Sequence, residues 1–131
     1  MAKVLGVGGI FFKTSDPAAL RHWYARVLGL DMHDWGAVFT PNMAADHPGA
    51  ATVFGPFNAD TDYFAPSTNE FMFNLMVDDL AGVLARCKRE GVEPVKVFDD
   101  EPNGRFAHIM DPEGHKIELW EPKPMAPSPS P

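Results

Sequence analysis

The feature that most constrains the fold lies near the C-terminus, where residues 104–121 read as two short strands joined by a tight turn. The connector, Asp111-Pro112-Glu113-Gly114, has the residue types that suit the dihedral angles of tight turns. Side chains alternate between the two faces of a strand. One face of this segment would carry Phe106, His108, Met110, Lys116, Glu118 and Trp120. The sequence therefore predicts an antiparallel hairpin with one polar and aromatic face.

The length of the turn decides which side chains meet across this hairpin. If Asp111 and His115 close a three-residue loop, His108 lies opposite Glu118 on the same face. A four-residue loop would shift the register and separate the imidazole from the carboxylate. In the first register, the two groups lie together between aromatic rings. We expect that arrangement to form one wall of a pocket.

Length and charge limit the classes of protein to consider. The chain has 131 residues, of which 45% are hydrophobic, so it is long enough for one domain with a core that needs no disulfide. Its net charge is −7 and it contains no basic run. Nucleic acids and anionic membranes are therefore not expected as partners.

The sequence also gives an expectation about the compartment. A single cysteine, Cys87, cannot form an internal disulfide, which indicates a reducing, cytoplasmic setting. The apolar run at residues 4–12 is short for a signal peptide and no small-residue cleavage site follows it. Nothing approaches the length of a transmembrane segment.

The first half of the chain predicts a strand, a helix and further strands. The apolar run at residues 6–14 is read as the first strand. A helix should follow, with Asp16 as its N-cap, Pro17 at its first position and Gly29 just past its end. Two short strands are expected within residues 32–40 and another at 51–57, where Gly and Pro indicate an edge or a bulge.

The second half repeats this order. Residues 70–77 predict a strand, and the aspartates at 78–79 cap a helix that Gly91 ends. Cys87 shares the apolar face of this helix and is expected to be buried packing rather than a nucleophile. A strand at residues 92–98 and the hairpin complete the half.

Strand–helix–strands therefore occurs twice, as two modules at about residues 4–57 and 70–121 joined by a linker at 58–69. Neither module could bury its sheet face and helix alone, so both should pack as one α+β domain over residues 1–122. The inner curve of the shared sheet would be the natural ligand cavity. The remaining residues, 123–131, form a Pro/Ser-rich tail that is expected to be disordered.

Two β-α-β-β-β modules, the D-P-x-G turn and the closing I-E-L-W-E-P together resemble the vicinal oxygen chelate superfamily over residues 4–122. That superfamily includes glyoxalase I, extradiol dioxygenases, fosfomycin-resistance enzymes and bleomycin-binding proteins. The resemblance implies a curved mixed sheet built by two modules, a small-molecule site inside it, and usually a homodimer.

The resemblance also implies a divalent metal held by about three side chains. Carried over by position, these are Glu118 in the closing strand, Met72 in the strand that opens the second module, and Gly9 in the first strand. A thioether is a weak ligand for a hard ion and glycine has no side chain. We therefore expect no standard metal site. A Zn, Ni, Fe or Mn ion would need other ligands, such as Glu118 and His108 with a residue from a partner subunit.

Glu118 and His108 are the candidate catalytic residues. A buried carboxylate beside an imidazole can transfer protons near neutral pH. Glu118 could instead be a buried acid paired with Lys116 or Arg105, and His108 a satisfied polar residue on a half-exposed strand. The other histidines (His22, His33, His47 and His115) are expected to be solvated, with His115 peripheral to the turn.

Candidate ligand-binding residues surround this pair. Asn74 shares a strand face with Met72 and could orient a carbonyl or hydroxyl group of the ligand. Four aromatic side chains could stack on a planar ligand, although aromatic residues in strands are more often core. They are Phe11, Trp35, Phe106 and Trp120.

Three functions follow from these residues and the resemblance. The first is a glyoxalase-like protein that binds a small organic molecule without the usual metal, with Glu118 as the base in any isomerase or lyase reaction. The second is a metalloenzyme of the glyoxalase or dioxygenase type with non-standard ligands. The third is a sequestering protein of the bleomycin-binding kind, without turnover, whose acidic balance would favour a basic antibiotic.

Overall fold

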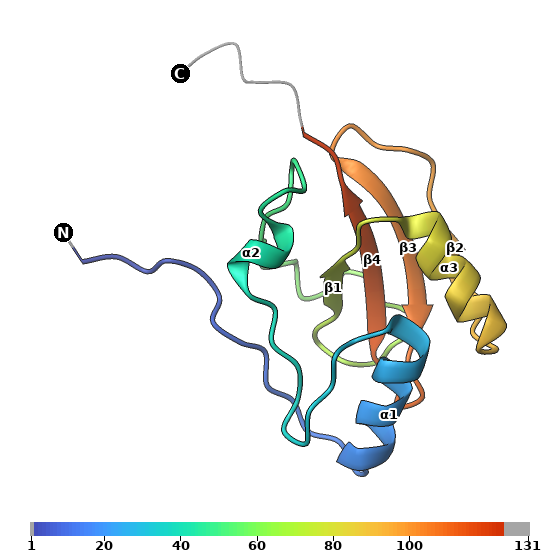
Figure 1. The fold of residues 1–131 in the computed structure, drawn as a ribbon. Coiled ribbons are helices and arrows are strands. Elements are labelled where there is room, and N and C mark those ends of the chain that lie inside the picture. Colours follow the sequence, from blue (N-terminus) through green and yellow to red (C-terminus); the bar gives the residue numbers. More distant parts are fainter. Residues whose placement is uncertain (1, 125–131) are drawn as a thin grey trace.

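The computed structural model describes residues 2–124, which form three helices and one four-stranded sheet (Figure 1). The helices are α1 (Pro17–Leu28), α2 (Pro41–Ala44) and α3 (Leu80–Arg89). The strands are β1 (Phe73–Met76), β2 (Lys96–Val97), β3 (Gly104–Met110) and β4 (Lys116–Pro122). The sheet order is β1-β4-β3-β2, with β1 parallel to β4 and the other pairs antiparallel. The predicted α+β class with a mixed sheet is confirmed, and the sheet is open rather than closed.

The hairpin of β3 and β4 has the register that the shorter loop predicts. The backbone N–H of Asp111 donates to the carbonyl of His115 at 3.0 Å, so a three-residue loop joins the strands. Gly114 lies within it at φ 85°, a left-handed conformation that glycine adopts without steric cost. As a result, His108 pairs with Glu118 across the two strands.

Both long helices begin and end as their sequence signals predict. Asp16 accepts a hydrogen bond from the Ala19 N–H at the start of α1, and Asp79 does the same for Gly82 at the start of α3. Gly29 follows α1 in the left-handed conformation at φ 71°.

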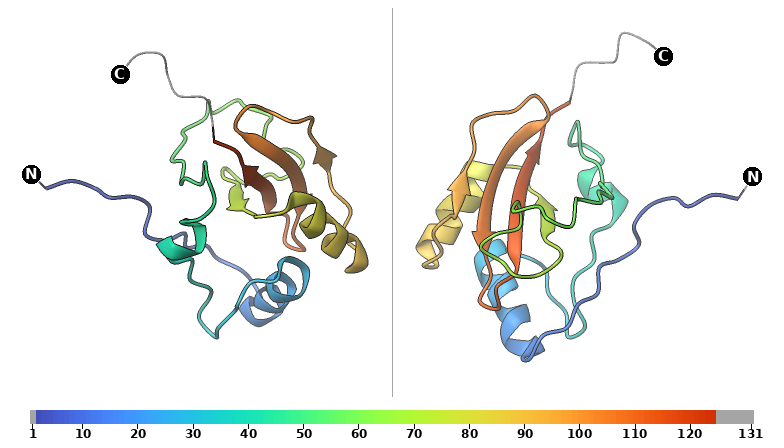
Figure 2. Two further views of the ribbon diagram at one scale, coloured as in Figure 1. Left: turned by 45° about the horizontal axis from the view of Figure 1, so that its top comes forward. Right: turned by 180° about the vertical axis from the view of Figure 1, so that it is seen from behind.

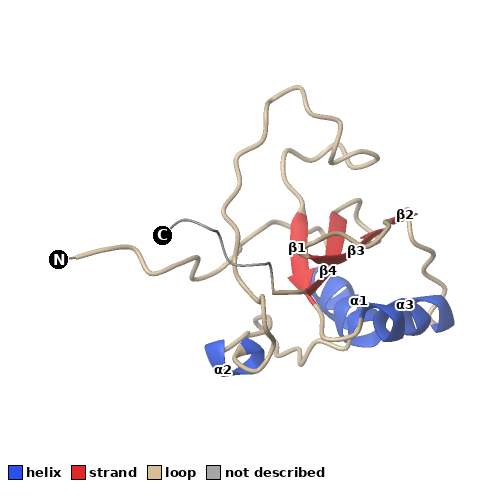
Figure 3. Cartoon of the chain, turned by 90° about the horizontal axis from the view of Figure 1, so that it is seen from above, coloured by secondary structure: helices blue, strands red, loops and turns tan. Residues whose placement is uncertain are grey.

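The core lies between the sheet and two helices. Figure 3 shows α1 and α3 on one side of the sheet, while the loop that enters β1 lies on the other side. Ile109 and Ile117 are fully buried, and Cys87 on α3 is also fully buried, as predicted. The core cluster consists of Leu20, Trp23, Tyr24, Val27, Phe73, Leu80, Cys87, Ala107, Ile109, Ile117 and Leu119. The opposite sheet face is therefore left for polar and aromatic side chains.

The second half forms the predicted β-α-β-β-β order, with shorter strands than expected. The strand predicted at residues 70–77 is formed only over Phe73–Met76, and the one at 92–98 only over Lys96–Val97. Gly91 follows α3 with φ 82°, as expected. The short helix α2 lies between the segments at residues 32–40 and 51–57 that were predicted to contain strands.

The strands predicted in the first half, at residues 6–14, 32–40 and 51–57, are wrong. In the described part of these segments, the only ladder contact is an isolated bridge between His33 and Gly36. Strand geometry is stabilised by hydrogen bonds to a neighbouring strand, and the N-terminal segment runs away from the sheet (Figures 1 and 2). These segments have the apolar pattern of strands, but in the described residues no neighbouring strand pairs with them.

No helix in the described range is both long and apolar enough to cross a membrane. The tail predicted to be disordered lies mostly outside the described residues, since 125–131 are not included.

Candidate functional site

A polar row crosses the sheet on the face away from α1 and α3. Asn74 on β1 pairs with Glu118 on β4, and Glu118 pairs with His108 on β3. The side chains contact one another as the register implies. Asn74 Nδ2 donates to Glu118 Oε1 at 2.8 Å, and His108 Nε2 lies 2.8 Å from Glu118 Oε2. Three of the predicted site residues are thus brought together by the order of the strands.

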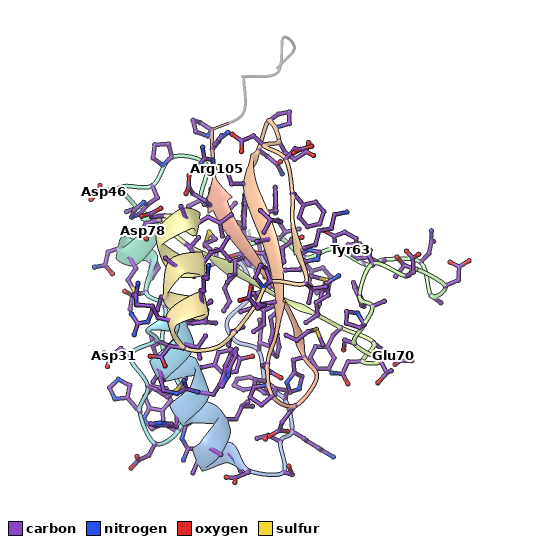
Figure 4. All side chains as sticks on the ribbon, turned by 90° about the vertical axis from the view of Figure 1, so that its right-hand side faces the viewer. Asp31, Asp46, Tyr63, Glu70, Asp78 and Arg105 are labelled. Atoms are coloured by element: carbon purple, nitrogen blue, oxygen red, sulfur yellow. The ribbon has the colours of Figure 1, made fainter. Side chains whose placement is uncertain are left out.

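A fourth member of this cluster, Tyr63, comes from the linker between the two halves. Its hydroxyl donates to Glu118 Oε2 and lies 3.3 Å from His108 Nε2. In Figure 4, Tyr63 lies on the side of the sheet away from the helices. Tyr63 was not among the predicted site residues. The available signal was the aromatic pair Tyr63-Phe64 in a largely polar linker, which is unusual unless the rings are covered.

The pKa of Glu118 is set by its burial and by the side chains that donate hydrogen bonds to its carboxylate. Its side chain is 12% exposed, and burial by itself would raise the pKa of the carboxyl group. Hydrogen bonds from His108, Tyr63 and Asn74 outweigh burial and hold the pKa of Glu118 below its ordinary value of 4.5. The group is therefore a carboxylate at neutral pH and a weak proton acceptor.

Lys116 holds the linker over this face rather than pairing with Glu118. Its Nζ donates to the backbone carbonyl of Tyr63 at 2.6 Å and lies 5.1 Å from the centre of the Tyr63 ring. Desolvation lowers the pKa of the buried Lys116 ammonium group, and the Glu118 carboxylate partly offsets this. Arg105 pairs with Asp100 at 3.3 Å. Neither basic residue forms an ion pair with Glu118 in the described part of the chain.

Aromatic side chains lie on both sides of the row. The rings of Phe106 and Trp120 are parallel, with centroids 6.1 Å apart, as expected for cross-strand neighbours on this face. Trp120 is buried and its indole N–H donates to the Asn103 carbonyl at 3.0 Å. Phe98 packs edge-on against His108 at 4.7 Å between centroids. The row therefore has apolar neighbours that a ligand could also contact.

The remaining predicted ligand-binding residues lie elsewhere. Met72 and Phe11 line a pocket between the N-terminal segment and the start of β1, and Phe11 is 95% exposed. Trp35 is 70% exposed and stacks on His33 at 5.4 Å. Among the described residues, neither Phe11 nor Trp35 has a ring contact with a member of the Glu118 row.

His115 corrects the prediction of a peripheral, solvated histidine. It is only 5% exposed, and its Nδ1 lies 2.6 Å from Asp111 Oδ2. Tyr24 on α1 donates to the same oxygen at 2.7 Å. The hairpin turn thus lies against the helix, and this tertiary contact buries a side chain that turn position alone would leave in solvent.

The side chains near Glu118 do not form a ligand set for the divalent metal that the superfamily implies. A catalytic metal normally has three protein ligands. Of the three family positions, one is Glu118, one is a methionine and one is Gly9. His108 is hydrogen-bonded to Glu118 itself. Within residues 2–124, no group of three His, Cys, Asp or Glu side chains is placed to hold a metal ion.

Comparisons with known proteins place the chain in a family. The model of the glyoxalase-like domain matches residues 9–120. TnmS3, an antibiotic binding protein from Streptomyces sp. CB03234, has a TM-score of 0.50 at 24% identity, covering 83% of this chain and 88% of that one. TioX from Micromonospora sp. ML1 has a TM-score of 0.49 at 17% identity, covering 84% and 93%. A comparison with curated protein sequences found no match. The chain belongs to the glyoxalase-like domain family, within the vicinal oxygen chelate superfamily.

Proposed function

We propose that the protein binds a small organic molecule that carries an amine, on the sheet face around Glu118 and without a metal. The observation that carries the proposal is a carboxylate fixed by three side-chain donors, Tyr63, His108 and Asn74. Each carboxylate oxygen has two acceptor positions. Oε2 accepts from two of the donors and Oε1 from one, so Oε1 can accept a further bond from a ligand.

The charge of the site supports a cationic ligand. Glu118 stays ionised because hydrogen bonds lower its pKa, and the whole chain has a net charge of −7. Asn74 is exposed and already donates to Glu118, so its side-chain carbonyl can accept from the same ligand. Phe106 would contact the apolar part of the molecule.

Binding is favoured over proton abstraction at carbon. A general base works best when its pKa lies near the working pH, and the pKa of Glu118 is lowered. The isomerase or lyase reaction is the second candidate, supported by the 2.8 Å contact through which His108 could share a proton with Glu118. A basic antibiotic is one ligand class that fits, and TnmS3 is itself an antibiotic binding protein.

The experiment compares aromatic amines with alcohols of the same skeleton, for example 1-naphthylmethylamine and 1-naphthylmethanol, by isothermal titration calorimetry. The wild-type protein should prefer the amine, and Glu118→Gln should weaken amine binding by about 10- to 100-fold, as loss of a charged hydrogen bond does. Alcohol binding should change little. Glu93→Gln, an exposed site on the loop after α3, is the matched control.

Equal binding of amine and alcohol by the wild-type protein would contradict the proposal. Unchanged amine binding in Glu118→Gln would do the same. Turnover of a bound carbon acid that Glu118→Gln abolishes would favour the second candidate instead.

We also propose that the protein is a cytoplasmic homodimer. Many apolar side chains of the first half are exposed, although monomeric proteins rarely expose large apolar patches. They include Val4, Leu5, Val7, Ile10, Phe11, Val38, Phe39, Val53, Phe54 and Phe57. A second copy could cover them and pair with the segments predicted to be strands. Light scattering coupled to size-exclusion chromatography should give twice the chain mass of 14.4 kDa, and a monomer would refute this.

A further inference from the structure

A second candidate site lies at the other end of the sheet, in a pocket of about 570 Å³. The pocket is formed where the N-terminal segment passes the start of β1 and the hairpin turn. Its walls include the rings of Phe12, Phe71 and Phe73 and the polar side chains of Lys13, Asn69 and His115. None of the Glu118 cluster lines it, so the two sites are separate.

The imidazole of His115, in the wall of this pocket, lies among phenylalanine rings. Its ring centroid lies 5.1 Å from that of Phe12, 5.5 Å from that of Phe73 and 5.8 Å from that of Phe71. Phe12 meets the imidazole edge-on, at an interplanar angle of 69°. An aromatic ligand that enters on this side would meet phenylalanine rings and the polar edge of the imidazole.

Asp111 fixes the orientation of this imidazole. Its carboxylate accepts from the Tyr24 hydroxyl, from the backbone N–H groups of Glu113 and His115, and from His115 Nδ1. With these donors in place, Nδ1 carries the proton, and in the neutral ring Nε2 is then the hydrogen-bond acceptor. Helix α1, the turn and the histidine are thus held as one unit.

The acceptor Nε2 is not sealed in the core. Among the described residues, it has no hydrogen-bond partner, while no fully buried side-chain nitrogen or oxygen is left without one. The atom is therefore accessible, and His115 is one of the residues that line the pocket.

We propose that this pocket binds a planar phenol, with its ring among Phe12, Phe71 and Phe73 and its hydroxyl donating to His115 Nε2. A phenol matches the two features of the pocket, since it has a flat apolar body and one strong O–H donor. A simple arene leaves Nε2 without a partner, and desolvating an unpartnered acceptor opposes binding. Binding here is independent of the amine proposed to bind at Glu118.

The test uses 2-naphthol and its methyl ether, 2-methoxynaphthalene, which differ in the hydroxyl donor. The wild-type protein should bind 2-naphthol about 10-fold more tightly, a discrimination typical of one good hydrogen bond. His115→Phe keeps the pocket aromatic but removes Nε2, and should bind both compounds with similar affinity. Glu93→Gln, at an exposed position that belongs to neither site, is the control and should keep the preference for 2-naphthol.

A measurement on the wild-type protein covers the case in which His115→Phe does not fold. In histidine side-chain NMR spectra, 2-naphthol should shift the Nε2 resonance of His115 and leave that of His108 unchanged. Equal affinity for the two compounds, failure of both to bind, or a shift at His108 instead of His115 would overturn the proposal. In that case the Tyr24–Asp111–His115 contacts only fasten α1 to the turn.

Discussion

The hydroxyl of Tyr63, in the linker between the two halves of the chain, donates a hydrogen bond to the carboxylate of Glu118 on β4. The backbone carbonyl of Tyr63 also accepts a hydrogen bond from Lys116 Nζ at 2.6 Å. Residues far apart in the sequence thus fix one another on the sheet face that carries the candidate site. The same hydrogen bond, together with burial, raises the pKa of the Tyr63 phenol.

Replacing Tyr63 with Phe should raise the pKa of Glu118 toward its ordinary value, because one of its three donors is lost. The free energy of unfolding should fall by about 0.5–1.5 kcal/mol. Carboxyl carbon NMR titration measures the first effect and urea denaturation the second. Phe64→Leu, on the neighbouring linker position, is a control that should leave the pKa of Glu118 unchanged. An unaltered pKa in Tyr63→Phe would refute the role of this hydroxyl.

The pH dependence of stability should carry the signature of a carboxyl group with a lowered pKa. Glu118 stabilises the folded state fully above its ordinary pKa of 4.5, and this contribution is lost as the pH falls through the lower pKa of the folded protein. In Glu118→Gln the group does not titrate. From about pH 6 to about pH 3, the unfolding free energy of the wild-type protein should therefore fall more steeply than that of the variant. Parallel curves from urea denaturation would contradict this.

The turn that sets the hairpin register has space for a methyl group at Gly114, but its backbone conformation there is unfavourable for any residue with a Cβ. A Cβ at Gly114 would meet no atom within 4 Å, yet φ there is 85°. Gly114→Ala should thus lower the free energy of unfolding by about 1–2 kcal/mol from backbone strain alone. Gly6→Ala, where a Cβ also meets nothing within 4 Å, should have little effect. Equal unfolding free energies for the two variants would show that the turn is not held in this conformation.

Removal of divalent metal should leave the protein unchanged, because the side chains near Glu118 do not supply three ligands. Protein purified without chelator should contain much less than one Zn, Ni, Fe or Mn per chain by elemental analysis. Treatment with EDTA should shift neither the melting temperature nor amine binding. A stoichiometric metal whose removal changes either property would favour the metalloenzyme hypothesis, with ligands from a partner subunit.

Local signals in the sequence predicted the two long helices and the hairpin. The caps at Asp16 and Asp79, Gly29 after α1 and the D-P-x-G turn each act over a few residues, so their consequences can be read directly. The sequence left two loop lengths open. The three-residue loop in the structure pairs His108 with Glu118, because the length of a loop sets the register of its strands.

Contacts between distant segments were decided only by the tertiary structure. An aromatic residue in the linker indicates that its ring is covered, but no local signal identifies Glu118 as the partner of Tyr63 or Tyr24 as a neighbour of the buried His115. In the first half, the alternation of apolar residues indicates which side chains would share a face of a strand. It does not indicate which neighbouring strand would form the backbone hydrogen bonds. Short-range propensities select backbone dihedral angles, whereas long-range contacts depend on which surfaces the whole chain brings together. For this protein, the sequence alone therefore determined the hairpin and the helices, and the packing of the linker and the turn completed both candidate sites.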